Sequence, residues 1–381
     1  MELLPDQYTI ASNGVSVALL PKEYALFAFL YAHRGQNFSR EHLLEKVWPL
    51  DYPTERTVDD HIYRLRKKLV PLGRLEIRTV RGYGYCLTER PPAGIDTHPA
   101  ARDEELQTAM TQVLGKYHLY GQGRSILTLA GQQDVLGYRL NPHYGVMIHF
   151  VRGDWKWLLE TEETPVLERL YYLLLMRICM EPAEDAIRYG ERALALRLLS
   201  PEKHTELDVL NLSYAHTLAG DHTAALQRLE KSYRLIESDP DYSEFLLATR
   251  NAELTARLMA DEPAAVLYEI AGDIERLLPN RPYLRETGSY KVLRGLVEVR
   301  HGSKAGGRAG IEEGMQVLEA SGFVPMILQA AITIIQFAKR FGGETALHER
   351  YSRLVERNLY HSGVPDLPGR LDQVIQEALS L

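Results

Sequence analysis

The chain of 381 residues is poor in cysteine and has no apolar run that suits a lipid bilayer. Its two cysteines, Cys86 and Cys179, cannot form a disulfide framework, which favours a reducing compartment such as the cytoplasm. The most apolar segments, residues 170–180 and 330–338, are shorter than the roughly 18 residues that suggest a membrane helix. The N-terminus has no basic segment followed by an apolar one, so we expect no signal peptide. We therefore expect a cytoplasmic protein that does not bind membranes.

The sequence also lacks the motifs on which catalysis and cofactor binding depend. The glycine-rich residues 302–310 do not have the order of a phosphate-binding loop, and we interpret them as a flexible turn. His143 and His149 have no cysteine or carboxylate at metal-ligand spacing. No nucleophile, base and orienting residue occur as a set. We therefore expect no enzymatic activity, no catalytic residue, no metal site and no cofactor.

Charge is unevenly distributed along the chain. The formal net charge is -7, yet residues 1–90 contain 13 basic and 11 acidic residues and carry a net charge of +2. Residues 56–81 alone contain eight basic and three acidic residues. A basic segment in an acidic protein is a candidate phosphate-binding surface. A solvated charged helix face would have the same composition.

Residues 1–90 are predicted to combine short strands with three helices. A β-hairpin with an Asn-Gly turn is expected first, and Pro21 is expected to begin a helix. Ser39 is a good N-cap for a second helix. Two further strands are expected near residues 75–80 and 83–87.

The third helix, predicted at about residues 55–70, has two distinct faces. Apolar residues recur at steps of four, three and four, which predicts one buried stripe made of Val58, Ile62, Leu65 and Leu69. The opposite side and its flanks are polar or charged. An apolar face opposite a face of Arg, His and Thr suits a helix that lies in the major groove of DNA.

Four segments of this region resemble the OmpR/PhoB-type winged-helix DNA-binding domain, in family order and at family spacing. They are LPKEYAL (residues 20–26), FSREHLLEKVW (38–48), RTVDDHIYRLRKKL (56–69) and TVRGYGY (79–85). The resemblance covers about residues 8–88 and implies a winged helix that binds double-stranded DNA.

The resemblance implies a role in DNA binding for individual positions. Arg64 would read bases, with Thr57 and His61 also facing the major groove. Arg81 would enter the minor groove from the wing. Phosphate contacts would come from Arg56, Arg66 and Thr79. The full set of DNA-binding residues that we expect is Arg56, Thr57, Asp60, His61, Arg64, Arg66, Lys67, Lys68, Thr79 and Arg81.

The chain departs from the family pattern in three respects. Asp60 occupies a DNA-facing position that is usually apolar, and Tyr63 stands where a second arginine is common. An acid repels phosphates but can accept from cytosine N4, so the operator sequence cannot be copied from relatives. Few residues precede the winged helix, so we expect no receiver domain and no switch by aspartyl phosphorylation. Residues 48–54 correspond to the segment through which the family contacts RNA polymerase, which favours an activator.

Beyond residue 104 the sequence pattern is helical and repetitive. Residues 211–230 resemble a tetratricopeptide (TPR) repeat, and similar second helices recur along the chain. Their anchor positions are Ala186, Ala225, Ala265, Gly310 and Ala346, at spacings of 39, 40, 45 and 36 residues. These spacings exceed the about 34 residues of the standard repeat.

The expected fold class is therefore multidomain and mainly α. We expect an α+β winged helix at residues 1–89 and a linker rich in Pro, Ala and Gly at residues 90–104. An all-α, TPR-like superhelical domain for sensing and dimerisation is expected at residues 105–381.

Stacked repeats of this kind leave a curved, solvent-filled groove that can bind peptides or protein segments. Asn211 and Asn251 are 40 residues apart and so occupy equivalent places on successive first helices. An Asn side chain offers a donor and an acceptor, which matches a peptide unit. Tyr214, Arg250 and Arg257 are expected near the same surface. Asn also serves helix–helix hydrogen bonding in such repeats, and this alternative stays open.

The sequence thus predicts a transcription regulator that binds DNA, forms a homodimer and responds to an effector, for which a signalling peptide is the candidate. A regulator that resembles the Streptomyces antibiotic regulators, without a small effector, would have a similar architecture. A protein–protein interaction adaptor with a degenerate winged helix is the alternative from a different functional class.

Overall fold

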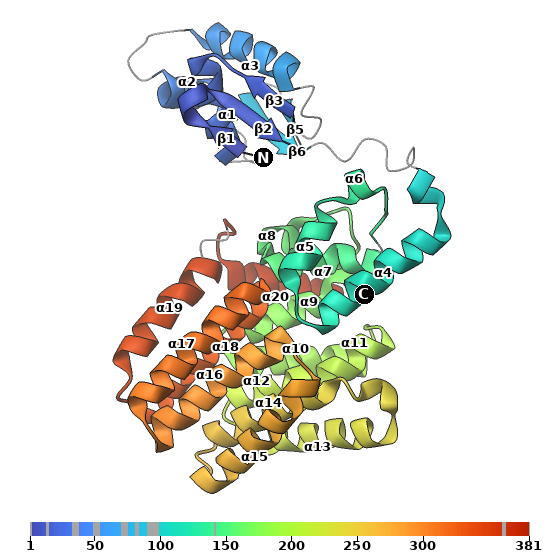
Figure 1. Ribbon diagram of the computed structural model, residues 1–381, viewed down its shortest axis with the longest axis vertical. Helices are drawn as coiled ribbons and strands as arrows, with labels where there is room; N and C mark the ends of the chain where they lie inside the picture. The colour runs from blue at the N-terminus through green and yellow to red at the C-terminus, as the bar shows by residue number, and fades with distance from the viewer. Residues whose placement is uncertain are drawn as a thin grey trace. The chain divides into compact units, whose positions relative to one another are not determined.

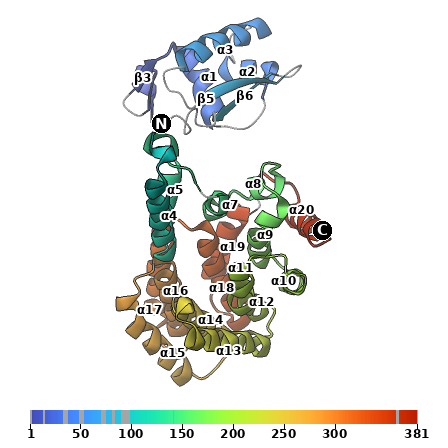
Figure 2. The same cartoon turned by 90° about the vertical axis from the view of Figure 1, so that its right-hand side faces the viewer.

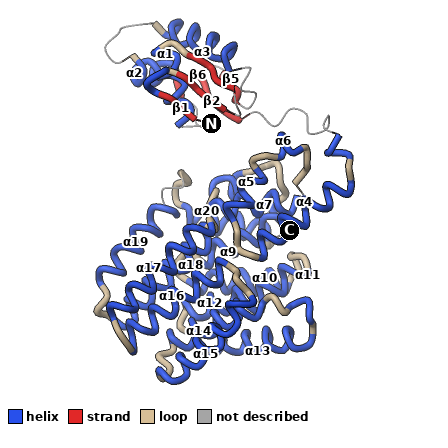
Figure 3. The backbone as a smooth tube through the Cα atoms, in the orientation of Figure 1, coloured by secondary structure: helices blue, strands red, loops and turns tan. Residues whose placement is uncertain are grey.

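The computed structural model describes residues 2–12, 15–32, 38–48, 54–69, 75–80, 84–89, 99–140, 142–359 and 363–380. The chain divides into two compact units, Met1–Pro99 and Ala100–Leu381. The division falls within the expected linker. In the described residues, strands occur in the first unit, whereas the second unit is helical (Figure 3).

The first unit contains two small antiparallel sheets. One has the order β1 (Glu2–Leu4), β2 (Thr9–Ser12) and β3 (Val15–Ala18). The other has the order β4 (Phe38–Ser39), β6 (Gly84–Glu89) and β5 (Leu75–Val80). The strands of the hairpin and of the wing confirm the sequence prediction. The pattern does not predict β1 and β4, because strands of two or three residues show too little alternation.

Three helices pack with these sheets: α1 (Pro21–Ala32), α2 (Arg40–Val47) and α3 (Glu55–Leu69) (Figure 1). Pro21 begins α1 as predicted, and the Ser39 hydroxyl accepts the backbone N–H of His42 at 3.1 Å as the N-cap of α2. The predicted apolar stripe of α3 is buried, and Val58, Ile62 and Leu65 are 0% exposed. Burial of this stripe leaves the opposite face of α3 in solvent.

The second unit begins with five helices of different lengths, namely α4 (Glu104–Leu119), α5 (Gly123–Ala130), α6 (Gln133–Leu136), α7 (Pro142–Arg152) and α8 (Trp155–Glu160). Helix pairs follow. The pairs are α9 (Val166–Ile178) with α10 (Ala183–Ala195), α12 (Leu212–Leu218) with α13 (His222–Ser238), α14 (Phe245–Met259) with α15 (Ala264–Leu277), α16 (Leu284–His301) with α17 (Lys304–Ser321), and α18 (Val324–Phe341) with α19 (Thr345–Leu359).

Two further features complete this unit. α11 (Pro201–Glu206) continues into α12 through a π-helical turn, Leu207–Asn211, and α20 (Leu367–Ala378) follows the last pair. Each predicted anchor position lies in the second helix of a pair, in α10, α13, α15, α17 and α19. None of the described helices is both long and apolar enough to cross a membrane.

The helical unit brings its early helices against its late ones. In α5, Arg124 donates to the carbonyl oxygen of Glu319 in α17 at 3.0 Å. In α9, Arg177 donates to the carboxylate of Asp372 in α20 at 2.7 Å, and α9 lies beside α20 in both views (Figures 1 and 2). The expectation of a curved, solvent-filled groove did not include these contacts between early and late helices. The helices surround a partly enclosed interior space. The sequence does not predict these contacts, because local periodicity carries no information about helices that are far apart in the chain.

The glycine-rich segment differs from the sequence prediction. Residues 304–310 are helical and belong to α17, so the interpretation as a flexible turn is wrong for them, whereas Gly302 and Ser303 connect α16 to α17. A Cβ on Gly307 would lie 2.5 Å from the carbonyl oxygen of Gly295 in α16. Glycine at this position lets the two backbones approach more closely than a side chain would permit.

We expect Gly307→Ala to destabilise the helical unit and Gly310→Ala, one turn further along α17, to be tolerated. The methyl group at residue 307 would overlap the Gly295 carbonyl, and overpacking costs about 1–3 kcal/mol. At residue 310 the new Cβ would lie 3.4 Å from the Gly295 Cα atom, an ordinary contact, and alanine favours a helix by up to about 1 kcal/mol. Urea unfolding followed by circular dichroism measures both changes, and equal losses would contradict this packing.

Candidate nucleic-acid interface and interior cavity

The solvent side of α3 carries one stripe of polar residues. Its exposed members recur at helical spacing, and they are Arg56, Asp60, Tyr63, Arg64 and Lys67. Tyr63, noted in the sequence only as a departure from the family, is 59% exposed, and the Lys67 ammonium lies 4.5 Å from the centre of its ring. Within the part of the chain that the structure describes, Arg56 and Arg64 have no ion-pair partner. The stripe can therefore offer both guanidinium groups to an external anion.

Arg66 and Thr79, both expected to contact phosphates, bind each other. The Arg66 guanidinium donates to the carbonyl oxygen of Ile77 at 2.8 and 2.6 Å and to the Thr79 hydroxyl at 2.8 Å. Arg66 thereby joins α3 to the wing strand β5. The sequence does not indicate this role, because β5 becomes a neighbour of α3 only in the folded unit.

Lys68, also expected to face DNA, forms an ion pair inside the unit. Its ammonium lies 2.6 Å from Oε2 of Glu23, which is 0% exposed. The same oxygen accepts the backbone N–H of Leu20 at 2.9 Å. Burial alone would raise the pKa of Glu23, but these two donors outweigh it and hold that pKa below its ordinary value. Lys68 thus acts as the counter-ion that keeps a buried carboxylate charged.

Thr57 and His61 lie at the margin of the exposed stripe and are both half-buried. His61 Nδ1 is 2.7 Å from the carbonyl oxygen of Thr57, and the His61 ring packs edge-on against Trp48, with the ring centres 5.0 Å apart. Arg81 lies outside the described residues, as does most of the segment 48–54. Their predicted contacts with the minor groove and RNA polymerase stay predictions.

A network that the sequence does not indicate orients α3. The Tyr85 hydroxyl of β6 donates to Asp59 Oδ1 at 2.6 Å, and Arg40 Nε of α2 donates to the same oxygen at 2.7 Å. Burial would raise the pKa of Asp59, but the bonds from Tyr85 and Arg40 lower it overall. Asp59 and Tyr85 are 26 residues apart, so no local pattern reveals the contact.

The second candidate site is the interior of the helical unit. Two cavities of about 360 and 550 Å³ adjoin there, and they share lining residues from α4, α11, α16 and α18 and from the segment 211–214. Residues of α14 line only the smaller cavity, and residues of α7 and α9 line only the larger one. These volumes are typical of sites that bind small molecules.

Three of the predicted effector-binding residues line this space: Asn211, Tyr214 and Asn251. Asn251 Nδ2 donates to the carbonyl oxygen of Glu286 at 2.9 Å, and Asn211 Nδ2 donates to the carbonyl oxygen of Glu206 at 3.1 Å. Asn251 thus bonds a neighbouring helix and Asn211 bonds its own stretch of helix, and both residues line the cavity. The geometry accommodates both interpretations that the sequence left open.

Arg250 and Arg257 differ from the expectation, because neither lines the cavities. Arg250 lies 3.0 Å from Glu253 Oε2, and Arg257 lies 2.9 Å from Glu253 Oε1. Arg257 also pairs with Glu262 at 3.1 Å. Each residue of a helix is rotated by about 100° from the one before it. Arg250 and Arg257 therefore lie on a different face of α14 from Asn251.

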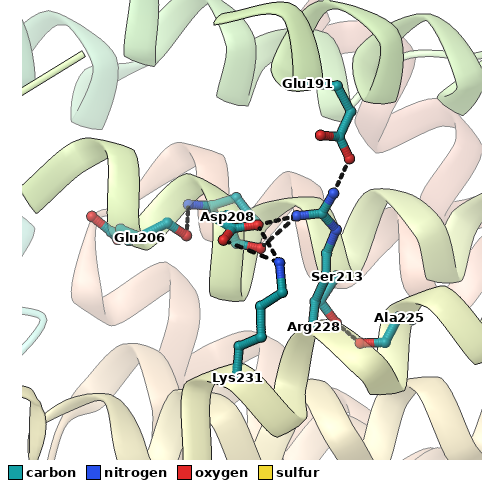
Figure 4. A network of polar contacts seen from close by, with 8 residues as sticks. Glu191, Glu206, Asp208, Ser213, Ala225, Arg228 and Lys231 are labelled. Atoms are coloured by element: carbon teal, nitrogen blue, oxygen red, sulfur yellow. Dashed lines mark hydrogen bonds and ion pairs between the residues drawn. The ribbon is translucent and has the colours of Figure 1, made fainter. Parts of the chain in front are cut away.

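Asn211 ends the π-helical turn Leu207–Asn211, and a buried arginine fixes this turn. Arg228 of α13, which is 9% exposed, lies between Glu191 of α10 and Asp208 of the turn (Figure 4). It donates to both carboxylates and, at 3.1 Å, to the carbonyl oxygen of Asp208. π-helical turns inside α-helices occur frequently at functional sites.

Three buried polar atoms of the smaller cavity's lining residues have no hydrogen-bond partner within the described chain: Asn251 Oδ1, Arg285 Nε and Glu286 Oε2. Asn251 is only 6% exposed. A buried polar atom without a partner costs about 1–3 kcal/mol, and native proteins keep few of them. Burial also raises the pKa of Glu206, which lines both cavities, although the Tyr171 hydroxyl and the Arg285 charge oppose the rise.

Sequence reasoning missed Arg285, Glu286 and Glu206 as cavity residues. The available signal was the charged pair Arg285 and Glu286 at the start of α16. Val292 and Leu293 follow this pair about two helical turns later. That spacing places the charges on the same face as the apolar residues. It does not tell whether this face meets solvent, a core or a cavity.

We expect Glu23→Gln to destabilise the winged-helix unit at neutral pH by about 1–3 kcal/mol, because the buried amide cannot replace a charged acceptor. The folded-state pKa of Glu23 is lowered, so its contribution is present above the ordinary value of 4.5 and is lost as the pH falls through the folded-state pKa. The difference between the wild type and the variant should therefore shrink in acid.

Hydrogen exchange of peptides from α1 and α3 in increasing urea measures this local free energy of unfolding. Glu45→Gln is the control, because Glu45 is an exposed residue of α2 and surface substitutions usually change stability by no more than about 0.5 kcal/mol. A loss in Glu23→Gln that is constant with pH would contradict the role of the ion pair.

The first unit is also the part of the chain for which a family match was found. Residues 14–87 match the family model described as "transcriptional regulatory protein, C terminal", an OmpR/PhoB-type winged-helix DNA-binding domain. The match covers α1, α2, α3 and most of the wing strands, and with them the exposed stripe of α3. It supports the assignment of this part of the chain to a DNA-binding transcription regulator.

Proposed function

We propose that the chain regulates transcription in the cytoplasm by binding double-stranded DNA sequence-specifically, with α3 in the major groove and the wing at the minor groove. The observation that carries this proposal is the stripe of α3, which presents Arg56, Arg64 and Lys67 to solvent opposite a fully buried apolar face. The family match to residues 14–87 supports the same conclusion.

The contacts divide the basic residues into two groups. Arg64 would read a base edge, while Arg56, Lys67 and the wing residue Arg81 would bind the backbone or the minor groove. Arg66 and Lys68 would instead hold α3 in place through β5 and Glu23. Asp60, beside Arg64 on the exposed stripe, would accept from a cytosine amino group.

We further propose that the helical unit dimerises and binds an effector in its interior cavity. α4, the first long helix after residues 90–98, lines this space with Gly115 and His118. A ligand could therefore act directly on the helix nearest in sequence to the winged helix. Filling the cavity would change the spacing of two recognition helices in a dimer.

The three unpaired buried atoms of the cavity's lining residues support an effector, because a bound ligand could supply their missing partners. This favours the effector-responsive regulator over one that resembles the Streptomyces antibiotic regulators. A signalling peptide stays a candidate, and the partial enclosure of the cavity favours a short one. The segment 48–54 would contact RNA polymerase, which favours an activator.

We expect Arg64→Ala to lower affinity for specific DNA by about tenfold or more, because one bidentate base contact is worth about 1–3 kcal/mol. The probes are fragments of the source genome enriched by binding to the full chain, titrated at several salt concentrations. Arg152→Ala, on the exposed surface of α7, removes the same charge and should leave the affinity unchanged. The wild type should show a log–log salt slope of several released counterions. Equally negligible binding by the wild type and Arg64→Ala would support the adaptor instead.

We also expect native mass spectrometry of the full chain with an enriched fragment to detect two protein chains per fragment. Tandem half-sites, which the related family uses, require two wings on one duplex. The control is the same protein with a fragment that was not enriched. A saturated complex with one chain per fragment would contradict dimeric binding.

A further inference from the structure

We propose that the interior cavity of the helical unit binds a small apolar zwitterion, a molecule with a free ammonium group, a free carboxylate and an apolar side chain. Free amino acids and short peptides both have this chemistry. The inference rests on the proposed function, because it names the chemical class of the regulator's effector.

The lining of the smaller cavity selects for an ammonium group. Four of its residues are glutamates, namely Glu202, Glu206, Glu244 and Glu286. Among the described residues that line it, the only arginine or lysine is Arg285. The unpaired atoms Asn251 Oδ1 and Glu286 Oε2 are both acceptors. An ammonium group has three N–H donors and no acceptor, so its chemistry complements acceptors of this kind.

Arg285 supplies the group that would bind a carboxylate. It lines both cavities, and its Nε–H has no acceptor in the described chain. Its ion pair with Glu286 is long, at 3.5 Å, and within the described residues most of its guanidinium fork has no hydrogen-bond partner. The guanidinium carbon lies 4.8 Å from the centre of the Phe323 ring, which holds the group in place. A planar guanidinium suits bidentate binding of a carboxylate.

The three unpaired atoms belong to one wall of the cavity. Asn251 Nδ2 bonds the backbone of Glu286 at 2.9 Å, and Arg285 is the preceding residue in α16. A donor and two acceptors therefore lie in neighbouring residues, which suits the oppositely charged groups of a zwitterion. A ligand of single charge would leave one side of this set without a partner.

The lining of the smaller cavity also contains apolar side chains. Leu210, Phe245, Val292, Leu293 and Met326 line the smaller cavity. These side chains suit an aliphatic or aromatic group of the ligand. The cavity of about 360 Å³ and its larger neighbour can hold a molecule that ranges from one amino acid to a short peptide.

The same site is in contact with the turn that follows α4. The backbone N–H of Leu284 donates to the carbonyl oxygen of Tyr120 at 2.9 Å. A Cβ on Gly121 would lie 2.8 Å from Cγ of Arg285, so the turn packs directly on this side chain. A carboxylate that moves Arg285 would therefore move the end of α4, the helix that begins the unit.

The test is isothermal titration calorimetry and thermal unfolding of the full chain with leucine, methionine, phenylalanine, Leu-Leu and Leu-Leu-Leu. Each probe is compared with its N-acetyl and C-terminal amide forms. We expect at least one free zwitterion to bind saturably and raise the melting temperature, and both blocked forms to bind at least about tenfold more weakly. Binding of single amino acids identifies one source of the ligand, and binding of only Leu-Leu or Leu-Leu-Leu identifies the other.

Two variants and a control locate the binding. Asn251→Leu and Arg285→Met should each weaken binding at least about tenfold, since each removes a group that contacts one charge. Should one variant not fold, the other still tests the site. Asn358→Ala in α19 should bind as the wild type does, because Asn358 Nδ2 bonds Leu354 of its own helix and the residue lines neither cavity.

Absence of binding by every free probe, or equal binding of blocked and free forms, would overturn the zwitterion site. The DNA titration of the same protein sample separates this result from a failure of the proposed regulator. Retained specific DNA binding without ligand binding leaves the DNA-binding function intact. Ligand binding that leaves DNA affinity unchanged supports the site but contradicts its role as the effector site.

Discussion

The interior of the helical unit depends on the closure of its early helices against its late ones. Arg177 is 1% exposed and donates to Asp372 of α20 and Asp185 of α10, so it joins the first helix pair to the last helix. An open stack of helix pairs would expose its concave side to water, and polar groups there would be hydrated. Closure removes bulk water from atoms such as Asn251 Oδ1, so a ligand that supplies a partner gains more than it would in an open groove.

The winged-helix unit shows how a basic segment can serve stability and binding together. Lys68 compensates the charge of Glu23, and Arg66 joins α3 to the strand β5. A second network, made of Asp59, Arg40 and Tyr85, connects α3 to α2 and β6. These internal contacts fix the helix without using the exposed stripe. The number of basic side chains left to bind DNA is therefore smaller than the composition suggests. They lie on one face of α3, where they can contact the same DNA molecule.

The two sites share a design in which buried contacts position a few unpaired groups. In the first unit, the unpaired groups are the exposed guanidinium groups of Arg56 and Arg64. In the second unit, they are buried atoms of α14 and α16. α4 lines the cavity, and the turn that follows α4 contacts Arg285. In the mechanism that we propose, a ligand in the cavity would influence DNA binding through α4.

The sequence by itself determined most of the longer elements and the buried face of α3, because these depend on neighbours within about four residues. It indicated the stripe of Val58, Ile62 and Leu65, the Ser39 cap and the second helices of the pairs. Only the tertiary structure decided which polar side chains are consumed by internal partners and which remain for a ligand. Arg66 and Ile77 are 11 residues apart, Asn251 and Glu286 are 35, and Arg177 and Asp372 are 195. Contacts over such separations depend on how whole helices pack, which no local periodicity encodes.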